Sequence, residues 1–302
     1  MTFMTDLISW RAVFYINIPV GLFALVLAWM FIPPDGAGKL SEPFDFQGAL
    51  LFLAGLIALL LGLNQGYAWG WRSPTIISLF VFAGLFLAIF IYVEKKRSAP
   101  LLDLSLFYNR IFSASVVSAV FNYIAVFSVL LLMPFYLLEG RGLSPSQAGL
   151  ILSIQPIVMA IIAPLSGSVS DRIGTRIPSV LGMLVLTGGI FLMSRLGQSS
   201  SILEIGIALA IVGLGTGTFI SPNNSAIMGA AARERQGIAA GTLATARSVG
   251  MVLGVGLAGA FFTTIIESTP GPNNLYLAFS ISLAAAAGFA AFGAIFSAIK
   301  RK

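Results

Sequence analysis

The chain has 302 residues, of which 58% are hydrophobic and only 9% are charged. Soluble domains carry about 25% charged residues, so this composition excludes a water-soluble globular protein and indicates a surface that faces lipid. Cysteine and histidine are both absent, which excludes disulfides, thiol nucleophiles and the usual zinc ligand sets, and no metal or cofactor is expected. We interpret the formal net charge of +6 as basic loops on the inner side of a membrane, not as a nucleic-acid-binding surface.

Nine apolar stretches are long enough to approach the thickness of a bilayer, which takes about 20 helical residues. We therefore predict an all-α integral membrane protein with nine transmembrane helices, numbered here as spans one to nine. In chain order the spans cover 14–32, 47–64, 75–93, 112–138, 146–168, 179–196, 203–228, 238–266 and 275–298.

Residues 94–111 separate spans one to three from a block of six spans. This segment begins with the basic run Glu94-Lys95-Lys96-Arg97 and continues with a mixed apolar stretch after Pro100. Such a pattern predicts an interfacial helix that lies along the cytoplasmic surface.

The distribution of basic residues predicts the orientation in the membrane. With the N-terminus outside, the inner segments hold twelve Lys and Arg residues and the outer segments hold four. Because basic residues concentrate on the cytoplasmic side, the C-terminus is expected in the cytoplasm. An outside N-terminus with no visible signal peptide suggests that preceding helices are missing or that the start is internal.

The strongest motif lies between spans five and six, where Gly167, Asp171, Arg172, Gly174 and Arg176 form a Gly-x-x-x-Asp-Arg-x-Gly-x-Arg pattern. We expect Gly167 to permit close helix packing and Gly174 to supply a tight turn in a short cytoplasmic loop. The carboxylate can cap the next helix or pair with an arginine, which would make the loop a conformational latch. The alternative is an ordinary basic inner loop.

This pattern resembles the signature loop of the major facilitator superfamily, which joins the second and third helices of a six-helix half. Here the motif lies between the second and third of spans four to nine. Residues 9–21, 100–104 and 142–149 resemble segments of the fourteen-helix drug:proton antiporters of the EmrB/QacA type (the DHA2 subfamily). The spacing of Gly241, Arg247, Gly250 and Gly254 in span eight also resembles that subfamily, and these glycines are expected to pack against a neighbouring helix.

The resemblance implies a layout and a function. Residues 1–32 would be the last helix of the N-terminal domain, 33–97 two extra central helices, and 98–302 the C-terminal six-helix domain of the major facilitator fold. It implies multidrug efflux by alternating access, coupled to proton influx in the full-length relative, from the inner membrane of the cell. The alternative is a non-transporting remnant, or one half of a split transporter. Expected partners are the lipid bilayer and a lipophilic small-molecule substrate, with a missing N-terminal half or a periplasmic adaptor left open.

Polar side chains within the spans are candidates for a substrate cavity. Arg247 is the only charge well inside a span, and it is expected to line the cavity or the domain interface, or to snorkel inward. Asn122 and Tyr123 in span four, Gln155 in span five and Asn223 in span seven suit a pocket for aromatic drugs. For each amide, an interhelical hydrogen bond is the equally weighted alternative.

All eleven carboxylates fall in loops or near span ends. Proton-coupled export needs a carboxylate that loads and unloads a proton at membrane depth, so we predict that this chain alone does not carry it out. A membrane enzyme is not expected either, because no loop is long enough to hold a cluster of catalytic carboxylates or a metal site.

Overall fold

The computed structural model describes Tyr15 and residues 17–31, 45–97, 104–268, 271 and 274–299. Throughout that part of the chain the regular elements are helices. The α-helices are α3 (Asn17–Phe31), α4 (Phe46–Gln65), α5 (Pro74–Glu94), α6 (Arg110–Phe135), α7 (Pro145–Leu152), α8 (Ile154–Ile173), α9 (Arg176–Met193), α10 (Ile202–Ala230), α11 (Gln236–Ser268) and α12 (Asn274–Ala298). Three short helical turns join them: η1 (Leu104–Tyr108), η2 (Tyr136–Gly140) and η3 (Arg233–Arg235).

Among the described residues, eight stretches of helix are long and apolar enough to cross a membrane. They correspond to predicted spans two to nine, with η2 extending α6, and α7 and α8 together forming span five. Span one is represented by the shorter apolar helix Ile18–Phe31. The prediction of an all-α membrane protein is therefore confirmed, and the chain is embedded in a lipid bilayer.

The predicted interfacial helix over 94–111 is not seen as one element. Glu94 is the last residue of α5, and the five residues of η1 form a single tight turn directly before α6. Residues 98–103 lie outside the described part. In the described part of this connection, the chain therefore turns rather than running along the membrane surface as an α-helix.

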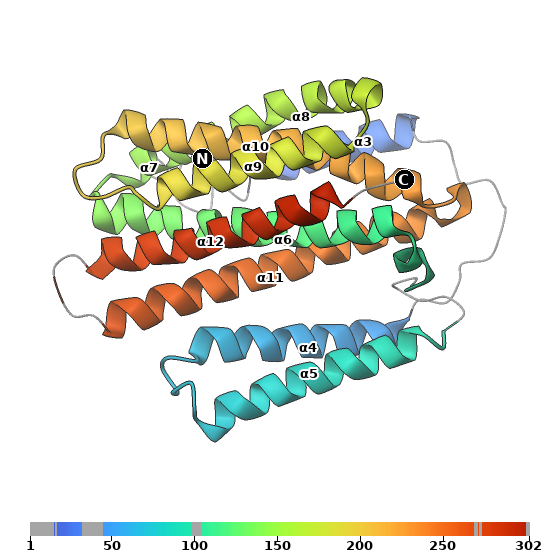
Figure 1. Cartoon of the computed structure of the whole chain (residues 1–302), viewed down its shortest axis with the longest axis horizontal. Coiled ribbons are helices and arrows are strands. Elements are labelled where there is room, and N and C mark those ends of the chain that lie inside the picture. Colours follow the sequence, from blue (N-terminus) through green and yellow to red (C-terminus); the bar gives the residue numbers. More distant parts are fainter. Residues whose placement is uncertain are drawn as a thin grey trace.

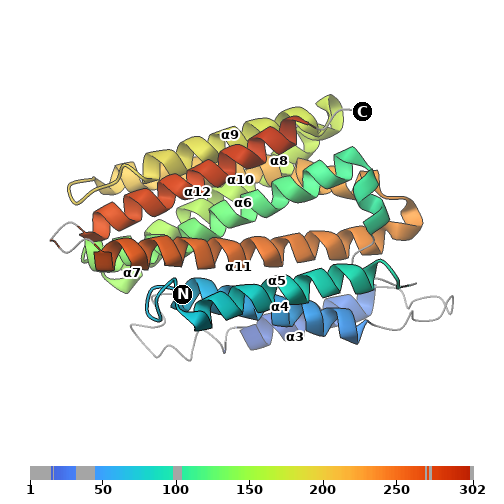
Figure 2. The same cartoon turned by 60° about the horizontal axis from the view of Figure 1, so that its bottom comes forward.

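Helices α6 to α12 form one bundle, and the hairpin of α4 and α5 lies along one side of it next to α11 (Figures 1 and 2). The bundle core lies between α6, α9, α10 and α12, where Leu132, Met183, Ile190 and Phe279 are fully buried. The hairpin contacts α11 where the side chain of Leu63 meets Gly256. Trp71 strengthens this contact, because its indole Nε1 donates a hydrogen bond to Thr264 Oγ1 at 3.3 Å.

Local sequence signals place the helix starts. Ser144 and Ser201 each form a capping box with the residue three positions later, so the first turns of α7 and α10 have their backbone donors satisfied. Ser73 caps α5 and is followed by Pro74, whose fixed φ angle suits the first helical position.

Glycines let the helices of the bundle approach closely, as expected where lipid supplies no hydrophobic driving force between helices. A Cβ on Gly215 of α10 would lie 2.3 Å from the backbone nitrogen of Leu186 in α9. On the other side of α10, a Cβ on Gly213 would lie 2.5 Å from the carbonyl oxygen of Gln155 in α8. Alternate glycines of α10 therefore form two close helix crossings.

Candidate functional site

Arg247 and Tyr123 are the two predicted cavity residues that the structure brings together. Arg247 lies in the first half of α11, its side chain is exposed, and its guanidinium carbon is 6.0 Å from the centroid of the Tyr123 ring in α6. It forms no ion pair with any described residue. A charge at this depth is expensive in hydrocarbon, so the face of α11 that carries it is not a lipid face unless the side chain snorkels.

Gly250 and Gly254 lie where α11 packs closely against α6, and this contact fixes the orientation of the α11 face that carries Arg247. A Cβ on Gly250 would lie 2.5 Å from Tyr123 Cβ, and one on Gly254 would lie 2.6 Å from the carbonyl oxygen of Ile124. Ser128 Oγ also donates to the Gly254 carbonyl at 3.2 Å. Gly241 differs, since no atom of another described helix lies within 4 Å of its would-be Cβ, and a packing role for it is not seen among the described residues.

Asn122 and Asn223 point into the bundle rather than toward a cavity, and both are fully buried. Asn223 Nδ2 donates to the Ser115 carbonyl at 3.1 Å and so ties α10 to α6. Asn122 Nδ2 meets only the sulfur of Met183 at 3.5 Å, and its Oδ1 has no hydrogen-bond partner among the described residues. The two amides are thus equally buried, but the hydrogen-bonding groups of Asn122 are less well satisfied than those of Asn223.

We expect Asn223→Ala to destabilise the protein more than Asn122→Ala. Both substitutions remove the same side-chain atoms from fully buried sites. The difference between the two losses of stability therefore measures mainly the hydrogen bonds that each asparagine makes. An interhelical hydrogen bond in a membrane protein contributes about 0.6 kcal/mol on average, and the difference should be of that size or larger. Thermal melting of the two variants in the same detergent measures it. Equal melting temperatures would mean that the Asn223 contact contributes nothing measurable.

Gln155 lies in the first turn of α8 and is half-buried. The helix is interrupted at Ser153, between α7 and α8. Pro156 lies three residues later and has no N–H for the carbonyl of Leu152, which explains the interruption. Pro156 therefore breaks the regular hydrogen bonding of the helix directly beside Gln155.

The signature segment is mostly helical rather than a loop. Helix α8 extends through Asp171 and Arg172 to Ile173, and α9 begins at Arg176. Gly174 and Thr175 make the turn, and Gly174 has a φ of 85° that favours glycine. Gly167 faces α10 closely, because a Cβ there would lie 2.7 Å from Ser221 Oγ.

Asp171 makes neither of its two predicted contacts within the described residues. The N-cap of α9 is Thr175, and no side chain caps that helix. No ion pair joins Asp171 to a described arginine, and its side chain is exposed. The carboxylate therefore has no described partner on its own bundle, so a latch role requires a partner outside the described residues.

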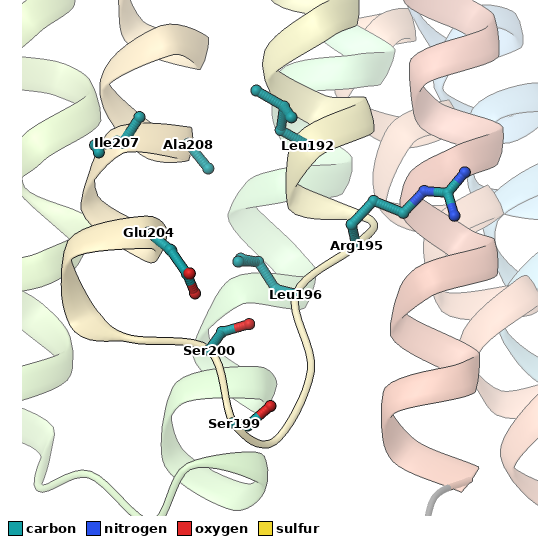
Figure 3. Close-up of a pocket in the computed structure, with 8 residues that line it drawn as sticks. All are labelled: Leu192, Arg195, Leu196, Ser199, Ser200, Glu204, Ile207 and Ala208. Carbon is teal, nitrogen blue, oxygen red and sulfur yellow. The ribbon is translucent and has the colours of Figure 1, made fainter.

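A surface pocket of about 490 Å³ lies elsewhere, between the end of α9 and the start of α10 (Figure 3). Arg195 and Glu204 line its polar part, but the Arg195 guanidinium extends away from Glu204 toward α12 and lies 4.8 Å from the Phe191 ring centroid. The other lining residues are Leu192, Leu196, Ser199, Ser200, Ile207 and Ala208. None of the cavity residues predicted from sequence lines this pocket.

These features define a polytopic α-helical membrane protein whose helix seams and intramembrane arginine are typical of transporters. The model of the Major Facilitator Superfamily matches residues 44–255 and again 115–301, and the chain therefore belongs to that superfamily.

The chain is similar to several curated transporters. It is 32% identical over 254 residues to the riboflavin transporter RibZ of Clostridioides difficile, covering 84% of this chain and 54% of that protein. It is 29% identical to the multidrug resistance protein Stp of Mycobacterium tuberculosis, over 89% of this chain and 50% of Stp. It is 31% identical to the tetracenomycin C resistance and export protein of Streptomyces glaucescens, over 85% of this chain and 48% of that protein. The chain thus spans about half the length of these relatives.

Proposed function

We propose that residues 1–302 act as the C-terminal portion of a fourteen-helix drug:proton antiporter that exports lipophilic small molecules. In this proposal residues 98–302 form the C-terminal transport domain, 33–97 the two central helices, and 1–32 the last helix of the N-terminal domain. The protein works in the inner membrane with its C-terminus in the cytoplasm, and substrate crosses by rocking of two domains around a midplane site.

The environment of the Arg247 side chain is the main observation that supports the proposal. Its guanidinium is exposed on α11 and has only the Tyr123 ring beside it among the described residues. A charge inside a membrane span faces water, a counter-charge or a protein interface. A water-filled pathway between two transporter domains provides that environment, and an aromatic ring beside a cation suits recognition of flat, lipophilic substrates.

The relatives support export of drugs, because two of the similar proteins are named for multidrug or tetracenomycin resistance. The similarity to a riboflavin transporter favours a second candidate substrate class, a flavin-like ring system. A flat aromatic member of either class would fit the environment of Tyr123 and Arg247.

The experiment uses the natural absence of cysteine. Arg247→Cys should react with a membrane-impermeant maleimide at least about tenfold faster than Leu184→Cys, because only the thiolate reacts and a thiol ionises only where water reaches it. Leu184 is a matched control, since it lies in the middle of α9 and its side chain is 52% exposed on the outside of the bundle.

Three outcomes of this labelling experiment distinguish the two substrate classes and test the proposal itself. Protection of Arg247→Cys by ethidium, a lipophilic cation, supports the drug pathway. Protection by riboflavin alone would point to the flavin-like substrate. Equal and slow labelling of both cysteines would show that Arg247 does not line a water-accessible pathway, and the proposal would fail.

A further inference from the structure

The surface pocket between α9 and α10 holds two charges of opposite sign that do not pair with each other. Arg195 lies two residues after the end of α9, Glu204 lies in the first turn of α10, and both line the pocket. Both side chains are exposed, and neither forms an ion pair with a described residue. The pocket therefore offers a cation and an anion to a ligand (Figure 3).

The contacts around these two side chains leave part of each charged group available. Glu204 Oε2 accepts a hydrogen bond from the backbone nitrogen of Ser201 at 2.9 Å, as part of the capping box of α10, and its Oε1 accepts none from a described residue. Among the described residues the Arg195 guanidinium lies beside the exposed ring of Phe191 alone. Arg141, the other arginine at this connection, donates to the Gln198 carbonyl and is thereby held by the backbone.

The apolar part of the pocket lies one helical turn deeper than the charges. Leu192 of α9 is three residues before Arg195, and Ile207 of α10 is three residues after Glu204. Their side chains are 49% and 50% exposed, on two helices that are long and apolar enough to cross a membrane. The charges thus stand at the end of two spans, where lipid headgroups lie, and the leucine and isoleucine stand at the depth of the acyl chains.

A ligand that matches this arrangement carries an anion, a cation and an apolar tail. A guanidinium binds phosphate well, and a carboxylate accepts charge-assisted hydrogen bonds from a primary ammonium. A phospholipid whose headgroup joins a phosphate to a primary ammonium has all three features. We propose that the pocket binds phosphatidylethanolamine, with its phosphate on Arg195, its ammonium on Glu204 and an acyl chain along Leu192 and Ile207.

The first test compares three lipids on the purified wild-type chain after bound lipid has been removed with detergent. Phosphatidylethanolamine, phosphatidylcholine and phosphatidylglycerol with identical acyl chains are added back, and native mass spectrometry measures how many lipid molecules each chain retains. One molecule of phosphatidylethanolamine should bind at least about threefold more tightly than the other two, a modest factor because the charges are exposed. Phosphatidylcholine has no N–H to donate, and phosphatidylglycerol has no positive charge. Equal binding of all three lipids would overturn the proposal.

Two substitutions test the two charges separately. Glu204→Gln should abolish the preference for phosphatidylethanolamine over phosphatidylglycerol, and it leaves the helix start intact because glutamine also forms a capping box with Ser201. Arg195→Gln should weaken the binding of both lipids by at least about threefold. Glu267→Gln and Arg72→Gln, at exposed positions outside the pocket, are the controls and should bind as the wild type does. A Glu204→Gln variant that keeps the wild-type preference would contradict the assigned role of Glu204.

A third measurement tests whether the ligand is a lipid. Phosphoethanolamine, which carries both charges but no acyl chain, should not displace the bound lipid when the two are present at equal concentration. Displacement would mean that the pocket takes a water-soluble zwitterion, and the assignment to a lipid would be wrong. None of these readouts depends on transport, so this proposal and the proposed function fail separately.

Discussion

Replacing Gly215 with alanine should separate α9 from α10 and destabilise the bundle by about 1–3 kcal/mol or more, the range for overpacked cores. The new Cβ would lie 2.3 Å from the backbone nitrogen of Leu186 and 2.8 Å from the carbonyl oxygen of Gly182. Both are backbone atoms of a helix, so no side-chain rotation relieves the clash. The expected result is a lower melting temperature and a smaller yield of monodisperse protein in detergent.

Gly188→Ala is the matched control for this prediction. Gly188 lies in the same helix pair, but in the part of the chain that the structure describes no atom of a neighbouring helix is within 4 Å of its would-be Cβ. Alanine is a better helix former than glycine by about 0.8–1.0 kcal/mol, so this variant should be neutral or slightly more stable. If Gly215→Ala melted at the same temperature as Gly188→Ala, the close crossing of α9 and α10 would be wrong.

The positions of the spans were predictable because hydropathy and helix caps are local signals. Span seven was expected over 203–228 and α10 runs from Ile202 to Ala230, starting directly after its Ser201 cap. Span nine was expected over 275–298 and α12 covers Asn274–Ala298. Span length follows from the thickness of hydrocarbon, which does not depend on how the helices pack.

The rotation of each helix about its own axis was not predictable, and this limited the prediction of the site. The helices are apolar on all faces, so no amphipathic pattern shows which side is inside. Asn122 and Tyr123 are neighbours in sequence, yet Asn122 contacts Met183 in the bundle core while Tyr123 faces Arg247. A sequence reading that places both in one pocket cannot make this distinction.

Two further features escaped the sequence analysis, one of them despite a visible signal in the sequence. The glycines of α10 alternate at positions 213, 215 and 217, a visible signal that two neighbouring helices approach closely. The burial of Asp45 and Glu94 had no such signal, because both residues stand at span ends where solvation is the normal expectation. Their burial depends on the hairpin geometry, which joins residues far apart in the chain.

A polypeptide of residues 1–302, purified and reconstituted in liposomes, should show no exchange of drug for protons above that of protein-free liposomes. The described carboxylates lie at helix ends, and no aspartate or glutamate lies near the middle of a described span. A coupling carboxylate has to exchange its proton with both sides of the membrane in turn. Asp45 and Glu94 lie together at one end of the hairpin, so neither of them lies where it could reach both sides of the membrane.

The measurement follows a fluorescent lipophilic cation and the internal pH at the same time, after a pH gradient is imposed. A proton ionophore added at the end should discharge the gradient and shows that the vesicles were sealed. Gradient-driven accumulation of the cation by residues 1–302 alone would contradict the prediction. Such a result would also mean that a group in this chain exchanges protons with both sides of the membrane.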